Sequence, residues 1–317
     1  MRSALIIGAG GQDGRLLARL LDDRKYAVRG WVRPEPATSA LCPCTKIDIL
    51  ESASVETELR KLSPDEIYYL AAFHHATEDI VEDSVTELLR RSFNVHVLGL
   101  INVLEAMEEC CPHARLFYAA SSHVFGRPVT EWQNEQTPFL PHSSYGISKA
   151  AGIQCCQLYR EQRGIFAATG ILFNHESSLR KPSFLSQKIV QGALRARDNP
   201  AYKLMLGDLE ARVDWGYAPD YVDAMFRILQ LPEASDFVIA SSELHTVREF
   251  AEAAFTAVGL DWRQHVETNV RLLQRESQSL RGDSRKLTAA TGWAPTIEFK
   301  EMVAKLVQEA ERTYETV

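Results

Sequence analysis

Tyr145 and Lys149 are the two residues whose types and spacing most directly predict chemistry. They lie four positions apart in the segment SYGISK at 144–149, so a helix would place them about one turn apart on the same face. A lysine ammonium next to a phenol stabilises the phenolate and lowers the phenol pKa from its usual value of about 10. Such a tyrosine can accept a proton from a substrate hydroxyl while a hydride leaves for a nicotinamide cofactor. The spacing alone is common by chance, so the hypothesis needs support from other motifs.

Three polar residues, Ser121, Ser122 and His123, follow the apolar run LFYAA at 116–120. That run predicts a buried parallel strand, whose carboxyl end faces the cofactor crevice of an α/β sheet. A serine there can hold the reacting hydroxyl, which makes Ser121 a candidate catalytic residue and Ser122 a candidate substrate contact. The order of a glycine turn, a serine after a later strand and then Tyr-x-x-x-Lys is a stronger signal than any one of these motifs.

A glycine-rich turn, GAGGQDG at 8–14, joins the first apolar run to the first helical pattern. Gly8, Gly11 and Gly14 allow a tight turn, close approach of the backbone to a pyrophosphate and close packing of helix on sheet. The N-terminus of the following helix presents free N–H groups to phosphate oxygens. We therefore predict that this turn, with Gln12 and Asp13, binds a dinucleotide. A purely structural turn is the alternative.

The sequence favours NADP as the cofactor, with NAD as the alternative. The second strand ends in GWVR, with Arg33 and no acidic residue at its tip, and an arginine suits a 2′-phosphate. A solvated surface arginine is the competing interpretation. Asp48 and Ile49 are predicted to lie at the adenine ring, although Asp48 could equally cap a helix. The other predicted cofactor contacts end the run EIYYLAA, and they are Leu70, Ala71 and Ala72.

The overall pattern is that of an α/β fold with a Rossmann-type, doubly wound parallel sheet. Apolar runs predict strands at 4–7, 27–32, 66–72, 116–120 and 166–172. Helical spacing of apolar residues lies between them, most clearly at 84–109 and 145–162. Strands that alternate with helices imply right-handed crossovers and a sheet covered on both faces.

The second half of the chain changes character. Helices are predicted near 185–197, 220–230, 246–258 and 298–313, with short strands near 203–206 and 236–240. We expect a dinucleotide-binding domain at 1–172 with returning pieces at about 210–245. A smaller, discontinuous α/β substrate-binding cap is expected at 173–317.

Composition describes an ordinary globular chain of 317 residues, of which 45% are hydrophobic and 24% charged. A net charge of −7 argues against a general nucleic-acid-binding protein. No apolar run approaches the roughly 18 residues of a membrane span, and the N-terminus lacks the pattern of a signal peptide. The six cysteines lack zinc-ligand spacing, so we predict reduced thiols, no metal and a cytoplasmic location.

The chain resembles the extended short-chain dehydrogenases/reductases that modify nucleotide sugars, and most of all the GDP-mannose 4,6-dehydratase family. The resemblance rests on GQDG at 11–14, ILFNHES at 171–177, DWG at 214–216, DYV at 220–222, DFVIA at 236–240, VREF at 247–250, and GD at 282–283 ahead of GW at 292–293. It implies that C4 of a hexose is oxidised, water is lost across C5–C6, and hydride returns to C6. Tyr145 would be the base for the C4 hydroxyl, and Lys149 would tune it and hold the ribose, so that both residues also contact the cofactor. Asn174, Glu176 and Lys188 would contact a nucleotide-diphosphate sugar.

The most informative departure from the family pattern is His123, because the family has there the glutamate that removes the C5 proton. An imidazole, with an ordinary pKa near 6.5, can abstract a proton acidified by a 4-ketone. His123 is therefore either an alternative base or a sign that dehydration has been lost. In the second case the enzyme would be a redox-only relative, such as a C4 oxidase, reductase or epimerase. A non-catalytic cofactor-sensing protein is a third hypothesis.

Other departures concern the substrate and the assembly. The family's Gln-Ser-His is FHH at 73–75, which either changes one wall of the site or packs as plain core. The arginine expected at 213 is Val213, so Arg212 and the displaced Arg275 are the candidate phosphate contacts. The basic segment that helps relatives build a tetramer is EPAT at 35–38 here, so we expect a homodimer through helices 84–109 and 145–162.

Overall fold

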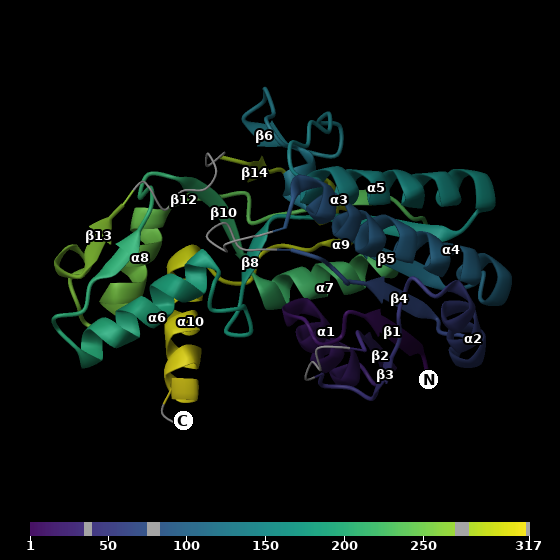
Figure 1. Cartoon of the computed structure of the whole chain (residues 1–317), viewed down its shortest axis with the longest axis horizontal. Helices are drawn as coiled ribbons and strands as arrows, with labels where there is room; N and C mark the ends of the chain where they lie inside the picture. Colours follow the sequence, from purple (N-terminus) through teal and green to yellow (C-terminus); the bar gives the residue numbers. More distant parts are fainter. Residues whose placement is uncertain (35–39, 75–82, 270–278, 315–317) are drawn as a thin grey trace.

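Seven parallel strands form the central sheet of the computed structural model, which describes residues 1–34, 40–74, 83–269 and 279–314 (Figure 1). Their order is β11-β7-β5-β4-β1-β2-β3. The strands are β1 Ser3–Ile7, β2 Ala27–Val32, β3 Cys44–Lys46, β4 Glu66–Tyr69, β5 Arg115–Ala119, β7 Phe166–Leu172 and β11 Asp236–Ile239. The strand order reverses between β1 and β4, so a ligand is expected outside the carboxyl ends of these strands.

Helices cover both faces of the sheet (Figure 1). One face carries α2 Ser52–Leu62, α4 Gly99–Cys110 and α5 Ser144–Arg163, whose apolar side chains share a core with alternate residues of the strands. The other face carries α1 Gln12–Asp23, α7 Ala218–Leu229 and α9 Arg285–Thr291. The sheet is therefore doubly wound, and the predicted fold class is confirmed.

A third hydrophobic core lies to one side of the sheet (Figure 1). It is built by three helices, α6 Leu185–Asp198, α8 Val247–Ala257 and α10 Phe299–Tyr314, together with β9 Leu204–Leu206 and Trp215. Short strands connect this region to the rest. One small sheet contains β8 Asn174–Glu176, β10 Arg212–Tyr217 and β12 Leu244–Thr246. A second pairs β13 Val266–Thr268 with β9. β14 Arg281–Gly282 pairs with β6 Trp132–Gln133. The domain boundary at residue 172 remains a prediction.

Two predicted elements differ from the structure. The strand expected at 66–72 ends at Tyr69, because the chain turns away beside the glycine turn after Leu70 N donates a last hydrogen bond to Ile7 O (2.9 Å). The single helix expected at 84–109 is α3 Val85–Phe93, a π-helical turn at Asn94–Leu98, and α4. A π-helical turn inserts one residue into a helix and frequently marks a functional site.

The described residues contain no helix long and apolar enough to cross a membrane. All six cysteines are free thiols, and only Cys111 and Cys156 are fully buried.

Gly8 occupies a backbone position that other residues would strain. Its φ of +94° lies in the region that favours glycine. A Cβ at Gly8 would lie 2.8 Å from Ala71 N, so the β1 turn touches the chain that leaves β4. A Cβ at Gly14 would lie 2.5 Å from Gly8 O, which lets α1 start directly above the turn. Both glycines are therefore required by packing alone.

We expect Gly8→Ala to destabilise the protein and to weaken dinucleotide binding. Gly164→Ala is the matched control, because Gly164 also has a positive φ (+66°) but a Cβ there would meet no atom within 4 Å. The control should lose about 1–2 kcal/mol of unfolding free energy from backbone strain, and Gly8→Ala should lose about 1–3 kcal/mol more from overpacking. Urea unfolding of both variants measures this, and equal losses would contradict the proposed close approach.

Candidate active site

The start of α5 brings Tyr145 close to the segment that follows β5. The Ser143 side chain caps the helix by accepting a hydrogen bond from Gly146 N (3.1 Å). A Cβ at Gly146 would lie 2.5 Å from His123 O, so only glycine allows this first turn to approach the 3-10 turn at Ser122–Val124. The result is that Tyr145 and His123, which come from different elements, have ring centroids 5.6 Å apart.

Ser121 forms hydrogen bonds to both of these residues. It is nearly buried, its Oγ accepts from His123 N (3.3 Å), and its side chain hydrogen-bonds to the Tyr145 phenol. Ser121, His123 and Tyr145 are thus brought together as the sequence predicted. Ser122 is buried in the same turn.

The Lys149 ammonium is directed to a backbone carbonyl near Tyr145. Its Nζ donates to Ala119 O (2.6 Å) and lies 5.8 Å from the centroid of the Tyr145 ring. Burial raises the pKa of Tyr145 to about 12, although the hydrogen bond from Ser121 and the charge of Arg180 oppose the rise. Burial also lowers the pKa of Lys149 to about 7. In this arrangement desolvation outweighs a cation that is directed to a carbonyl, so the predicted lowering of the phenol pKa by Lys149 stays a prediction.

A buried histidine that sequence reasoning missed holds this arrangement together. The Nε2 atom of His96, in the π-helical turn, accepts a hydrogen bond from Phe73 N (3.0 Å). Its Nδ1 therefore carries the proton and donates to Ser148 Oγ (2.7 Å), which in turn donates to Tyr145 O (3.0 Å). Burial, with the nearby charges of Lys149 and His74, holds the pKa of His96 well below its usual value. Neutral His96 thus ties the loop after β4 to α5.

The loop after β4 places a third imidazole at the site. The His74 ring lies 4.4 Å from the Tyr145 ring and 6.0 Å from the His123 ring, measured between centroids. Phe184 lies on another side of His74 at 5.7 Å. His74 therefore lies beside Tyr145, as expected if FHH changes one wall of the site, and plain packing stays the alternative. His75 lies outside the described residues.

The side chains of Gln12 and Asp13 connect the glycine turn to β8. Both carboxylate oxygens of Asp13 lie 3.1 Å from His175 Nε2, and Gln12 Nε2 donates to His175 O (3.2 Å). Burial alone would raise the pKa of Asp13 and lower that of His175, but their mutual attraction reverses both shifts. Each charge therefore favours the other, and the pair joins the predicted cofactor site to the segment that carries the predicted substrate contacts.

Arg180 is a second residue that sequence reasoning missed. Its Nη1 donates to His175 O (3.2 Å), its guanidinium lies 4.2 Å from the Phe184 ring, and its charge acts on Tyr145 and Asp13. Glu176 is buried and pairs with Arg180 (3.3 Å) and Ser186 Oγ (2.5 Å). Its carboxylate thus bonds to protein groups and supports Arg180, and its contact with the substrate stays a prediction. The position of Arg180 four residues after Glu176 was the available sequence signal.

The remaining predicted cofactor contacts lie around the carboxyl ends of β1, β2 and β4. Gly11 caps α1, and a Cβ there would meet only Gly8 O at 3.4 Å, so protein packing does not explain this glycine and a nearby pyrophosphate would. Arg33 is exposed directly after β2. Asp48 accepts from Leu50 N (3.0 Å) in a turn before α2, whose N-cap is Glu51, so it is not the helix cap. The others are Ile49, which is half-buried, Leu70 and Ala71 beside the glycine turn, and Ala72, which is exposed.

The predicted substrate contacts are more scattered. Asn174 lies half-buried on β8 and Lys188 half-buried on α6. Arg212 is exposed at the start of β10, where its charge acts on Glu249 of α8. Val213 points to the other face of that strand and packs against the third core, so neighbouring Arg212 cannot occupy the same space. Arg275 lies outside the described residues.

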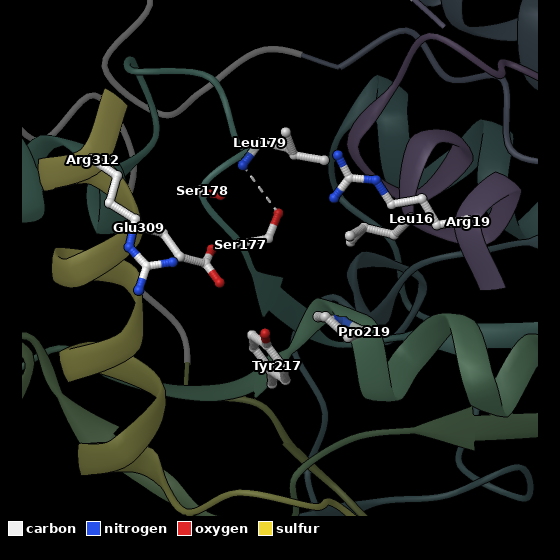
Figure 2. Close-up of a pocket in the computed structure, with 9 residues that line it drawn as sticks. All are labelled: Leu16, Arg19, Ser177, Ser178, Leu179, Tyr217, Pro219, Glu309 and Arg312. Carbon is white, nitrogen blue, oxygen red and sulfur yellow. Dashed lines mark hydrogen bonds between the residues drawn. The ribbon is translucent and has the colours of Figure 1, made fainter. Parts of the chain in front are cut away.

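A cavity of about 400 Å³ lies between α1, the segment 177–179, the start of α7 and the last turns of α10 (Figure 2). Ser177 belongs to its wall, accepts from Leu179 N (3.2 Å, dashed in Figure 2) and donates to Gln12 Oε1 (2.8 Å). Its described lining includes neither Tyr145, nor His123, nor Lys149, so it is separate from the candidate active site.

Comparison with known proteins identifies relatives along nearly the whole chain. The family model described as GDP-mannose 4,6 dehydratase matches residues 5–306. GDP-mannose 4,6 dehydratase 1 of Arabidopsis thaliana is 35% identical over 96% of this chain and 89% of its own length. The Homo sapiens GDP-mannose 4,6 dehydratase is 31% identical over 96% of this chain and 90% of its own length.

Solved structures share the fold at lower identity. The dTDP-glucose 4,6-dehydratase of Bacillus anthracis, in complex with NAD, superposes with a TM-score of 0.85 at 19% identity and covers 99% of this chain and 98% of its own. The structure of RMD from Pseudomonas aeruginosa, complexed with NADPH, has a TM-score of 0.81 at 22% identity and covers 98% of this chain and 100% of its own.

The buried lysine predicts a pH dependence of stability. The pKa of Lys149 is about 7 in the folded protein and about 10.4 in an unfolded chain. Between these values the unfolded state binds more protons, so Lys149 makes the free energy of unfolding rise with pH. Its destabilising charge acts fully below the folded pKa and disappears as pH rises towards the unfolded one.

Lys149→Met should therefore weaken the rise of unfolding free energy between about pH 7 and pH 9, as measured by urea unfolding. Lys300→Met, an exposed lysine of α10, should keep the wild-type slope. If Lys149→Met also keeps the wild-type slope, the lysine is not buried as a strained cation.

Proposed function

Because the chain belongs to the GDP-mannose 4,6-dehydratase family, we propose that it catalyses the NADP-dependent 4,6-dehydration of a nucleotide-linked hexose, with GDP-mannose as the first substrate to test. The observation that carries this proposal is the meeting of Ser121, His123 and Tyr145 outside the carboxyl ends of the central strands. The glycine turn that would hold the dinucleotide lies at the same edge of the sheet.

Tyr145 is the proposed base for the C4 hydroxyl, and Ser121 orients that hydroxyl through the hydrogen bond it shares with the phenol. NADP, when bound at the glycine turn, supplies the hydride acceptor and later the hydride donor. With a pKa of about 12, Tyr145 holds its proton at neutral pH until a cation approaches. Lys149, one helical turn away, is the residue that can provide this cation by turning from Ala119 O.

His123 is the proposed base for the C5 proton. Its ring stands edge-on to Tyr145 at 5.6 Å between centroids, so both imidazole and phenol can reach neighbouring carbons of one sugar. A neutral imidazole can accept the C5 proton, because the ketone at C4 makes that proton acidic. The redox-only alternative requires only Tyr145 and Ser121, so His123 separates the two functions.

The substrate diphosphate is proposed to lie between Asn174 of β8 and Lys188 of α6. Arg180 adds a cation close to Tyr145. Arg212 and Arg275 stay proposals as phosphate contacts.

We propose a homodimer, in which α3, α4 and α5 pair with the same helices of a second copy around a two-fold axis. Apolar side chains are exposed on this surface: Leu89 of α3 (37%), Leu158 of α5 (49%) and Leu98 of the π-helical turn between α3 and α4 (49%). The cytoplasm remains the proposed location on the grounds of composition.

Product analysis in D₂O tests the dehydratase proposal. The wild type should form a 6-deoxy-4-keto sugar with deuterium at C5. Tyr145→Phe should lose turnover by about 10²–10⁴-fold while it still binds the cofactor, because the phenol acts on the substrate. His123→Ala should still oxidise C4, and it should accumulate reduced cofactor and a 4-keto sugar. A wild-type product with unchanged mass and an intact C6 hydroxyl would favour the redox-only alternative.

Arg33 tests the cofactor assignment. Arg33→Ala should weaken NADP binding by about 10–100-fold and leave NAD binding nearly unchanged, because only NADP carries the 2′-phosphate for a charge-assisted hydrogen bond. Arg29→Ala, an exposed arginine of β2, is the control and should affect neither. Equal losses for both cofactors in Arg33→Ala would show that this residue does not read the 2′-phosphate.

A further inference from the structure

Among the rings around Tyr145, His74 has no role in the proposed oxidation at C4 or in the removal of the C5 proton. This residue stands where the β4 loop passes the start of α5, and its ring lies closer to Tyr145 (4.4 Å) than the ring of His123 does (5.6 Å). Position 74 is therefore part of the reaction site, and it carries a group that can hold or release a proton near neutral pH.

The backbone beside His74 is fixed from two directions. Phe73 N donates to the buried His96 ring (3.0 Å), and the Arg91 guanidinium lies 4.2 Å from the centroid of the Phe73 ring. His74 itself lies between the rings of Tyr145 and Phe184. A side chain held in this way can be aimed at one atom of a substrate.

Loss of water across C5–C6 requires two proton transfers. One group must remove the C5 proton, and a second must protonate the C6 hydroxyl, because hydroxide is a poor leaving group. The His74 and His123 rings lie 6.0 Å apart, so one ring can reach the C6 oxygen of a bound sugar while the other reaches its C5 hydrogen. The site thus offers two separate imidazoles for the acid and the base that the elimination needs.

We propose that His74 is the general acid that protonates the departing C6 hydroxyl while His123 removes the C5 proton. The inference rests on the proposed dehydratase function. The C5–H bond breaks and its proton goes to His123. Its electron pair forms the C5=C6 double bond as the C6–O bond breaks. The oxygen leaves as water with the proton from His74.

With these roles, every proton transferred during the cycle can be restored within the site. Tyr145, as the phenolate stabilised by the Lys149 ammonium, gains a proton from the C4 hydroxyl, and the protonated His74 loses one to the departing water. His123 returns its proton to C5 when hydride comes back to C6. Transfer of one proton from Tyr145 to His74, whose rings are in contact, restores the starting state.

The test compares two substrates in one set of variants. His74→Gln should lose formation of the 6-deoxy product from GDP-mannose by about 10²–10⁴-fold, yet still exchange the C5 proton for deuterium in D₂O. With the GDP-mannose analogue that carries chlorine at C6, the same variant should approach the wild-type rate, because chloride leaves without a proton. His123→Gln should fail with both substrates. His113→Gln, an exposed histidine, is the control and should match the wild type with both.

Either of two results would overturn the proposal. Conversion of GDP-mannose by His74→Gln at nearly the wild-type rate would mean that another group is the acid. Failure with both substrates, with an unchanged melting temperature and unchanged NADP binding, would make His74 a positioning residue. His74→Ser, which carries the residue that the family pattern has at this position, repeats the test if the glutamine variant is unstable.

Failure of the underlying function is distinguishable from these results. In that case the wild type itself would oxidise and re-reduce GDP-mannose without forming any 6-deoxy product. The acid role of His74 would then fall together with the dehydratase assignment.

Discussion

The close approach of Gly8 to the backbone at Ala71 is the constraint on which the rest of the site depends. A Cβ would reach 2.8 Å from Ala71 N, so the turn after β1 and the chain leaving β4 meet as bare backbone. β4 ends at Tyr69 beside this contact, and the loop that follows is tied to α5 through His96 and Ser148. The same turn starts α1, whose first side chains reach β8 through Asp13 and His175. One backbone contact thus sets both walls of the crevice.

Burial dominates the electrostatics of this crevice. The phenol of Tyr145 is harder to ionise than a free tyrosine, the ammonium of Lys149 is easier to neutralise than a free lysine, and His96 stays neutral. All three shifts oppose charge in a site of low polarity. Burial thus disfavours ionisation of these three groups, whereas Asp13 and His175 each favour the charged form of the other.

Histidines take over positions around Tyr145 that the family pattern gives to other residue types. His123 stands in place of a glutamate and His74 in place of a serine, and both rings contact the phenol ring. A carboxylate can accept and return one proton, whereas two imidazoles can divide the roles of acid and base. The substitutions are understandable as a pair, since a lone His123 would provide a base without a partner to assist the leaving group.

The sequence by itself determined the elements and the cofactor turn, because these depend on local patterns. Apolar runs located β1, β2, β5 and β7, helical spacing located α5, and glycine spacing located the turn at 8–14. The order of these motifs also identified Ser121, Tyr145 and Lys149 as one group, and the resemblance to the family added His123. The tertiary structure alone decided which distant side chains join them. His74, His96 and Arg180 come from three separate segments, and no spacing in the chain reports a contact between segments so far apart in sequence. The tertiary structure also decided where the Lys149 side chain points. A spacing of four residues places Lys149 and Tyr145 on one face of the helix, but it cannot show that Lys149 is buried and donates to Ala119 O instead.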